Sequence, residues 1–485
     1  MEVLILVLSF VILLVIGVPI AFSIGIAGIL TMLMSIDAMP AFTTYAHRMA
    51  TGLDSFALLA IPFFVLAGGI MNSGGIAMRL INFARVLVGK LPAGLAFVNV
   101  IANMLFGAIS GSAAAATSAI GSIMGPEMKK EGYDENFSAA VNITSATTGL
   151  TIPPSNILII YSLASGGASI TALFLAGYVP GILTGVGIML VAMSMMILKN
   201  KGTSGLMKTL GAILLVSLGL VGVGIGLKVL HSNASPTIFK SVIYGLLGAG
   251  FIAASIKSAR NWEFFKFAFR KFIDALPSLL MLVIVIGGIV AGFFTATEAS
   301  AIAVLYAFIL AMLYKEITLK DMPAVILRSI RTTCIVLLLV ATSIGMSWIM
   351  SYENIPQDVS AGLLSLSDNP IVILLMINFI LLFVGIFMDM TPAVLIFTPI
   401  FLPIVTAQLG MDPIHFGIIM VLNLCVGLCT PPVGSVLFIG CSVAGLKIEN
   451  VIKPLLPMFI VMFVVLMLVT YIPSLSLWLP GLLMK

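Results

Sequence analysis

Two double-proline segments hold the residues best suited to chemistry in this sequence. Gly149-Leu-Thr-Ile-Pro153-Pro154 and Gly427-Leu-Cys-Thr-Pro431-Pro432 both lie inside long apolar runs. Proline lacks a backbone N–H and clashes with the carbonyl group of the preceding turn, so each segment is expected to break a helix. The carbonyl oxygens that lose their helical partners near Gly149–Ile152 and Gly427–Thr430 are hard ligands suited to Na⁺.

The helices that resume after each break offer the other half of a transport site. They begin at Ser155-Asn156 and at Gly434-Ser435. A helix N-terminus presents unpaired N–H groups and the positive end of the dipole to an anion. A carboxylate and a driving cation can therefore share one site, as in the discontinuous helices of secondary transporters. The alternative, in which proline and glycine only kink packed helices, is disfavoured because two equivalent motifs occur.

A hairpin with a polar tip precedes each double-proline segment. The first hairpin covers 95–124 and turns at Gly107–Ser112, and the second covers 372–405 and turns at Gly385–Pro392. Their arms of about 13 residues are too short to cross a bilayer, which favours re-entrant hairpins. Irregular backbone at membrane depth is tolerated only where protein or a cavity surrounds it.

Two carboxylates and a hydroxyl cluster extend the candidate site. Asp389 lies on the second tip and Glu298 in Thr295-Ala-Thr-Glu-Ala-Ser300, and an ionisable group at membrane depth is a functional candidate by default. Asp389 could instead cap a helix, and Glu298 could be a helix-start carboxylate favoured by the dipole. The Ser/Thr cluster before the first break could instead form hydrogen bonds between packed helices. The candidate substrate ligands are Ser112, Thr148, Ser155, Asn156, Asp389 and Ser435.

The elements that position these residues occur twice along the chain. The offset in numbering that separates Pro153 from Pro431 also separates Gly107 from Gly385. The same offset takes Asp134 to Asp412 and Gly132 to Gly410. A run of matches without an insertion indicates an internal duplication.

Loop charge gives the two copies opposite orientations. The loop after the first hairpin, Met128–Glu135, contains two lysines, whereas its counterpart, Ala407–Pro413, contains no lysine or arginine. The positive-inside rule places the first loop in the cytoplasm and the second outside. Equivalent loops on opposite sides mean inverted repeats. Continuing this assignment along the chain places both termini in the periplasm.

The composition is that of a membrane protein. The chain has 485 residues, of which 61% are hydrophobic and 8% charged, with a net charge of +5. A soluble domain carries about 25% charged residues. The basic residues lie in short loops, which serves membrane orientation and not nucleic-acid binding. The four cysteines lie in apolar segments, and the scattered histidines give none of them a metal-binding cluster. Cys425 and Cys429 are one helical turn apart, which could suggest a redox pair, but we interpret them as small core residues.

We therefore expect an all-α polytopic membrane protein with about 12 spanning helices plus two hairpins. The first inverted repeat covers 1–198 and contains a broken helix at 137–164. Residues 199–272 contain a pair of inserted spans, Thr209–Leu227 and Ile238–Ala254, and a cytoplasmic amphipathic segment, Lys257–Lys271. The second repeat covers 273–485, with its broken helix at 414–445.

These motifs resemble those of a known transporter family. Gly107–Ser112, Gly149–Asn156, Met388-Asp389 and Gly427–Gly434 are similar to the large membrane subunit, of the DctM/SiaM type, of tripartite ATP-independent periplasmic (TRAP) transporters. The resemblance covers about residues 1–198 and 273–485. It implies a multi-pass protein of the bacterial inner membrane, an elevator mechanism, Na⁺ coupling, a small four-helix membrane partner and a periplasmic substrate-binding protein.

The resemblance also implies two or more Na⁺ sites. By similarity, one would involve Ser110 with Gly149, Ile152 and Pro154, and the other Met388 with Gly427, Thr430 and Gly434. This sequence departs from the family in two places. The usual Thr-Pro-Thr-Glu-Ala has Ala296 at its second position, and residues 199–272 are longer than the family pattern.

The family carries C4-dicarboxylates, sialic acid and other sugar acids. The hydroxyl-rich run from Ser145 to Asn156 favours a sialic or sugar acid, and no arginine clamp is visible near either motif. The closest alternative is a stand-alone Na⁺/carboxylate symporter or a cation antiporter of the same plan. An enzyme is disfavoured because large polar loops with acidic or histidine clusters are absent. A channel lacks a continuous polar lining, and the absence of a Walker motif disfavours ATP-driven transport.

Overall fold

The chain folds into a helical assembly in which long and broken helices are combined. The computed structural model describes residues 2–73, 75–230, 262–431 and 433–484, and every regular element in these ranges is helical. Eight helices of this described part are long and apolar enough to cross a membrane, and several shorter apolar helices accompany them. The expectation of an all-α polytopic membrane protein is confirmed.

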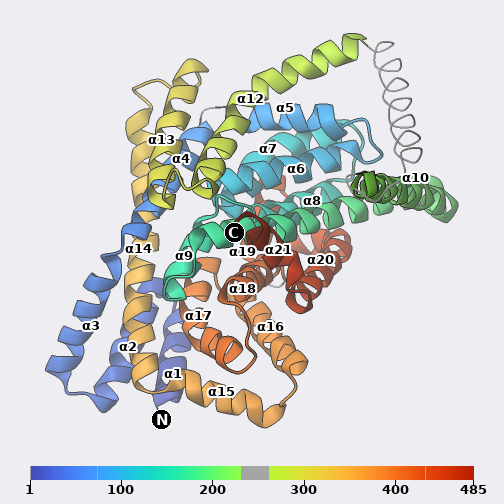
Figure 1. Cartoon of the computed structure of the whole chain (residues 1–485). Helices are drawn as coiled ribbons and strands as arrows, with labels where there is room; N and C mark the ends of the chain where they lie inside the picture. The colour runs from blue at the N-terminus through green and yellow to red at the C-terminus, as the bar shows by residue number, and fades with distance from the viewer. Residues whose placement is uncertain (1, 74, 231–261, 432, 485) are drawn as a thin grey trace.

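The first half of the chain runs from the outer helices through the first broken helix to the long helix that follows it (Figure 1). Its elements are α1 (Glu2–Val15), α2 (Ile20–Ser35), α3 (Ala38–Leu53), the 3₁₀ turn η1 (Phe56–Leu59), α4 (Ala60–Ser73), α5 (Ile76–Val88), α6 (Gly94–Ser110), α7 (Ala113–Lys130), α8 (Glu135–Thr148), α9 (Asn156–Ala164) and α10 (Ile170–Leu230).

The second half repeats this order from its fourth helix onward. Its elements are α12 (Trp262–Val290), α13 (Ala296–Leu313), α14 (Met322–Tyr352), α15 (Ile355–Leu366), α16 (Pro370–Phe387), α17 (Met390–Ala407), α18 (Pro413–Gly427), α19 (Ser435–Ala444), α20 (Ile448–Tyr471) and α21 (Ser474–Leu483).

The helices repeat with the spacing found in the sequence. The broken helices α8 and α18 start at positions 135 and 413, and α10 and α20 start at 170 and 448, so both pairs keep the offset between Pro153 and Pro431. The short helices α5 and α15, which start at 76 and 355, keep it to within one position. In Figure 1, α5 lies at one end of the molecule and α15 at the opposite end. The two hairpins that follow them therefore enter from opposite ends, as inverted repeats require.

A contact between equivalent residues locates the symmetry axis. The thiol of Cys425 donates a hydrogen bond to the carbonyl oxygen of Thr147 at 3.2 Å, and these two positions are 278 residues apart, the offset of the duplication. Residues related by a twofold axis can touch each other only close to that axis. The broken helices α8 and α18 therefore cross at the centre of the duplicated core. Cys425 and Cys429 are free and buried against α8, as the core interpretation expected, whereas Cys334 is exposed.

Both hairpins differ from the sequence-based expectation in their length. Their arms have 17 or 18 residues and not about 13, and α16 and α17 are each long enough to span a membrane. The helices continue into the polar tips, so that each turn is reduced to Gly111-Ser112 or Met388-Asp389. The two hairpins are present, but the argument from short arms was wrong, because most residues of the predicted tips are helical.

The inserted region is described only in part. Of its two expected spans, Thr209–Leu227 lies within α10, which has a non-helical residue at Gly202, and Ile238–Ala254 lies outside the described residues. The expected amphipathic segment Lys257–Lys271 is described from Trp262 onward, where it opens α12.

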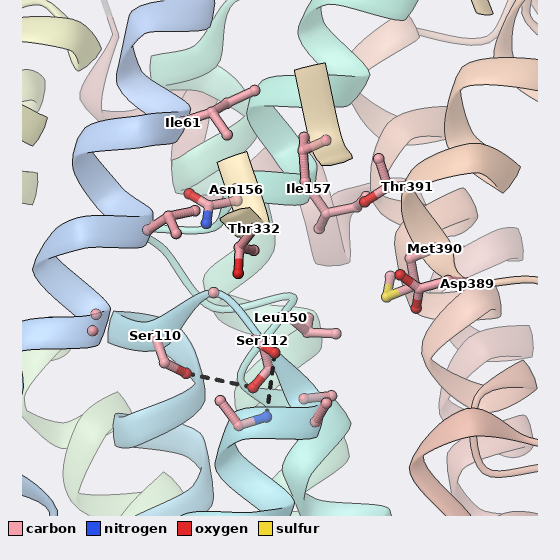
Figure 2. A pocket seen from close by; sticks show the side chains of 18 of the residues that line it. Ile61, Ser110, Ser112, Leu150, Asn156, Ile157, Thr332, Asp389, Met390 and Thr391 are labelled. Carbon is pink, nitrogen blue, oxygen red and sulfur yellow. Dashed lines mark hydrogen bonds between the residues drawn. The ribbon is translucent and has the colours of Figure 1, made fainter. Parts of the chain in front are cut away.

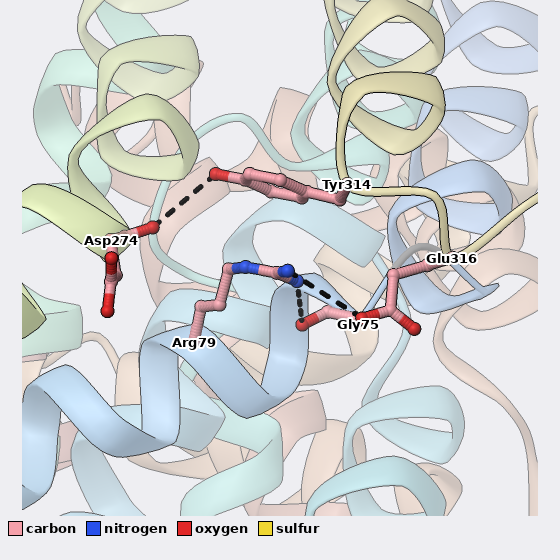
Figure 3. A network of polar contacts seen from close by, with 5 residues as sticks. All are labelled: Gly75, Arg79, Asp274, Tyr314 and Glu316. Atoms are coloured by element: carbon pink, nitrogen blue, oxygen red, sulfur yellow. Dashed lines mark hydrogen bonds and ion pairs between the residues drawn. The ribbon is translucent and has the colours of Figure 1, made fainter.

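A polar network fastens the start of α5 to the neighbouring helices (Figure 3). The Arg79 guanidinium lies 3.6 Å from the centroid of the Tyr314 ring and donates a 3.1 Å hydrogen bond to the carbonyl oxygen of Gly75. It also pairs with Glu316 at 3.6 Å, and the Tyr314 hydroxyl donates to the carbonyl oxygen of Asp274 at 3.4 Å. This network joins α5, which leads to the first hairpin, to α12 and the α13–α14 loop.

Candidate functional site

The first break separates α8 from α9 as the double proline predicted. Helix α8 ends at Thr148 and α9 begins at Asn156. The Ser155 hydroxyl donates to the carbonyl oxygen of Leu150 and closes the loop on itself. Across the described chain, the carbonyl oxygens of Gly149 and Ile152 accept no hydrogen bond. Both residues are buried, so these oxygens are available to a ligand other than bulk water.

The second break has the same form and is tied to a hairpin. Helix α18 ends at Gly427 and α19 begins at Ser435, and Pro432 lies outside the described residues. The Gly434 N–H donates to the carbonyl oxygen of Ile386 at 3.1 Å, which holds the break against the second tip. The Thr430 hydroxyl donates to the carbonyl oxygen of Val426 at 2.8 Å.

Each hairpin lies against its broken helix through a pair of glycines. A Cβ atom added to Gly149 would lie 2.5 Å from the Cα of Gly107, and one added to Gly427 would lie 2.7 Å from the Cα of Gly385. Only glycine permits such an approach of two backbones. The two pairs are equivalent under the offset of the duplication, so both repeats use the same contact between hairpin and break.

The two tips and the two breaks enclose one cavity of about 310 Å³. Ser110 and Ser112 lie on one side of it and Asp389, Met390 and Thr391 on the other (Figure 2). The remaining walls come from α9, α19, α4 and α14. The polar lining residues are Asn72, Ser110, Ser112, Asn156, Arg328, Ser329, Thr332, Asp389, Thr391 and Ser435.

Four helices begin at this cavity. The first residues of α7, α9, α17 and α19 all line it. Of these four, only α7 has a side-chain cap, since the Ala115 N–H donates to the Ser112 hydroxyl at 3.2 Å, whereas Ser155, Asp389 and Gly434 provide none. Each N-terminus carries about half a positive charge and unpaired N–H groups. The cavity is therefore suited to an anion.

The structure brings together four of the six residues expected to contact substrate. Ser112, Asn156, Asp389 and Ser435 line the cavity. The Asn156 side chain is only 9% exposed, and its amide has no hydrogen-bond partner among the described residues. The other two candidates, Thr148 and Ser155, do not line the cavity. Both hydroxyls donate to nearby backbone carbonyl oxygens, that of Thr148 to Ser145 at 2.6 Å.

The expected Na⁺ ligands divide by whether their oxygens are engaged. The carbonyl oxygens of Gly427 and Gly434 accept hydrogen bonds from the N–H groups of Thr430 and Phe438. Within the described ranges, those of Gly149, Ile152, Pro154, Met388 and Thr430 accept none. All of these residues except the half-buried Thr430 are buried, and free carbonyl oxygens fit a hard cation. Of this set, only Ser110 also lines the cavity; its hydroxyl donates to the Ser112 carbonyl oxygen at 3.4 Å.

Glu298 has the structural role that the sequence left open. Its carboxylate accepts a hydrogen bond from the Thr295 N–H at 2.8 Å, and its own N–H donates to the Thr295 hydroxyl at 3.3 Å, so the two residues form a capping box at the start of α13. The residue does not line the cavity. Its position at the beginning of a helix was the signal for this role.

Sequence reasoning missed the wall of the cavity that α4 and α14 form. Arg328, Ser329, Thr332 and Val336 follow one another at helical spacing and line it from α14. Asn72 lines it from α4. The spacing shows that these residues share a helix face, but only the packing shows that this face meets the tips.

Comparison with known proteins supports a transporter. The family model described as "Tripartite ATP-independent periplasmic transporter, DctM component" matches residues 7–475. The chain is 49% identical to an uncharacterized protein, YgiK, of Salmonella typhimurium, over 98% of this chain and 96% of that one. It is 37% identical to the C4-dicarboxylate TRAP transporter large permease protein DctM of Pseudomonas aeruginosa, covering 95% of this chain and 94% of the relative.

A solved structure shares the fold. The YdaH transporter of Alcanivorax borkumensis, described as having an unusual topology, superposes with a TM-score of 0.58 at 12% identity. The match covers 93% of this chain and 90% of YdaH. At this identity the similarity concerns the architecture alone.

Proposed function

Because this chain belongs to the DctM component family of tripartite ATP-independent periplasmic transporters, we propose that it is the large subunit of an Na⁺-coupled carboxylate importer. The observation that carries the proposal is the single cavity between both hairpin tips and both helix breaks. Its four helix N-termini suit an anionic cargo, and the free carbonyl oxygens behind them suit the coupling ion.

The coupling energy is sufficient for accumulation. One net positive charge that moves through 100 mV contributes about 2.3 kcal/mol, which concentrates a cargo roughly 50-fold. Cation and anion sites that share the same two tips provide a physical basis for coupling, because the bound cation fixes the backbone that faces the anion. This subunit would take up its cargo from a periplasmic binding protein and function in the inner membrane with a small four-helix subunit.

The two sides of the cavity support an elevator motion. Helices α4 and α14 pack on each other, since a Cβ atom on Gly69 would lie 2.8 Å from the Ser329 hydroxyl oxygen. The first hairpin meets this wall through small residues: a Cβ atom on Gly68 would lie 3.0 Å from the Cα of Ser110. A smooth contact of this kind lets both hairpins and both broken helices slide as one body past α4 and α14.

Uptake by proteoliposomes tests this function. The chain is reconstituted with its small subunit, and uptake of a carboxylate is measured with and without an Na⁺ gradient and with and without the binding protein. We expect uptake to require both. Uptake without a binding protein would identify a stand-alone symporter instead, and uptake without Na⁺ would refute the coupling.

Two hydroxyl substitutions test the Na⁺ sites. Ser110→Ala and Thr430→Val are expected to weaken Na⁺-dependent uptake while the protein remains folded. Ser122→Ala is the matched control, because this exposed hydroxyl on α7 donates only to its own helix, at 3.0 Å to Ala119. Unchanged sodium dependence in both test variants would remove the proposed sites.

A further inference from the structure

Among the described residues, the cavity is lined by one basic side chain, Arg328, and one acidic side chain, Asp389. Arg328 is exposed to the cavity, and its guanidinium forms neither a hydrogen bond nor an ion pair with any described residue. An unpaired guanidinium within a membrane protein is costly, and such groups usually face a partner or a water-filled cavity. The described part of the chain supplies no such partner.

The position of Arg328 favours a ligand that lies between the α4–α14 wall and the hairpins with their broken helices. It lines the cavity one helical turn before Thr332, on the α14 wall. Figure 2 shows Thr332 and Asn156 above the first tip, with Asp389 and Thr391 across the cavity. A ligand held there therefore contacts α14 through Arg328 and Thr332, and the hairpins and breaks through their N–H groups.

We propose that Arg328 binds the carboxylate group of the transported anion from the α14 side of the cavity. This inference rests on the proposed carboxylate transport and names the residue that recognises the charge. The planar guanidinium offers two parallel N–H donors that match a carboxylate, which a lysine or a hydroxyl cannot reproduce. Arg328 thus supplies the formal positive charge that the helix N-termini, as partial charges, do not.

Binding to the purified complex of large and small subunits measures this directly, without the binding protein. The probes are succinate, gluconate and N-acetylneuraminate at fixed Na⁺, and the neutral succinamide serves as a charge control. The readout is the probe concentration that gives half-maximal thermal stabilisation. The variants are Arg328→Gln, Arg328→Lys and the control Arg331→Gln, whose arginine is exposed on the same helix but does not line the cavity.

We expect Arg328→Gln to weaken carboxylate binding at least roughly tenfold, the usual loss for a hydrogen-bonded charge. Arg328→Lys should fall between this variant and the wild type, and Arg331→Gln should match the wild type. The Na⁺ concentration that gives half-maximal thermal stabilisation should change by no more than about twofold in any variant, because the proposed Na⁺ ligands lie on the hairpins and helix breaks and not on α14.

Three outcomes would overturn the inference. Wild-type carboxylate binding by Arg328→Gln refutes it while the proposed function stands. An equal decrease in affinity for carboxylate and for Na⁺ would mean that Arg328 maintains the fold and does not recognise the carboxylate. If the wild type binds and transports no carboxylate, the proposed function fails, and the role of Arg328 fails with it.

Discussion

The paired glycines provide the sharpest test of how hairpins and breaks act together. Replacing Gly149 with alanine would put a Cβ atom 2.5 Å from the Gly107 Cα and 2.9 Å from the Ala108 nitrogen. Carbon atoms in contact lie about 3.5–4.0 Å apart, so the two backbones must separate by about 1 Å. All the atoms met belong to the backbone, so no side chain can move aside to relieve the overlap.

The expected magnitude follows from the cost of overpacking, about 1–3 kcal/mol. When this strain falls on the Na⁺-bound arrangement, affinity for Na⁺ decreases roughly 5- to 150-fold. The four glycines should form a graded series. The added Cβ atom would lie 2.5 Å from the Cα of the paired glycine for Gly149, 2.7 Å for Gly427, 2.9 Å for Gly107 and 3.1 Å for Gly385. The loss of Na⁺ affinity should therefore be largest for Gly149→Ala and smallest for Gly385→Ala.

Sodium titrations of uptake and of thermal stability measure the series. The control is Gly125→Ala in α7, where an added Cβ atom has no neighbour within 4 Å. This control should keep wild-type Na⁺ affinity and gain up to about 1 kcal/mol of stability, because alanine favours a helix more than glycine does. If Gly149→Ala and Gly427→Ala both fold and keep wild-type Na⁺ affinity, the breaks and hairpins do not form the cation sites.

Three further substitutions separate transport from stability. Replacing Pro153-Pro154 with Ala-Ala should let the first break close into a helix and abolish uptake by protein that still reaches the membrane, which radiolabelled uptake and membrane immunoblots check. Tyr45→Phe removes the buried 2.9 Å hydrogen bond to an α14 carbonyl oxygen, and should lower stability by about 1 kcal/mol in thermal unfolding without changing Na⁺ dependence. Glu298→Ala breaks the capping box of α13 and should lower the thermal unfolding temperature, again at unchanged Na⁺ dependence.

Local rules were enough to predict the breaks and the duplication. Proline cannot donate within a helix, so the positions of Pro153-Pro154 indicated where α8 must end. The offset between the motifs then predicted the order of the second half, because duplicated sequences fold alike. The turn lengths could not be predicted as well. Ala108–Ser110 have no local feature that ends a helix, and they continue α6.

Side-chain direction was the part that sequence could not supply. Thr148 and Ser155 flank the break in the sequence, yet their hydroxyls bond to nearby carbonyl oxygens, as serine and threonine often do. Arg328 showed the reverse problem. It lies near basic residues at a helix start, a pattern typical of membrane orientation, and only the packing of α14 against the tips turns it towards the cavity.

The placement of the two formal charges has a consequence for the proposed elevator. Arg328 belongs to α14, whereas Asp389 directly precedes α17 on a tip, so only the negative charge would travel with the hairpins. A single uncompensated charge crossing 100 mV changes the energy by about 2.3 kcal/mol. A bound Na⁺ near the second tip would cancel the charge of Asp389, but a monocarboxylate carried with the hairpins adds a second negative charge, while Arg328 stays on α14. The hairpins loaded with a monocarboxylate would therefore cross with their charge balanced only when two Na⁺ are bound, which links the number of coupled cations to the side of the cavity on which each charged residue lies.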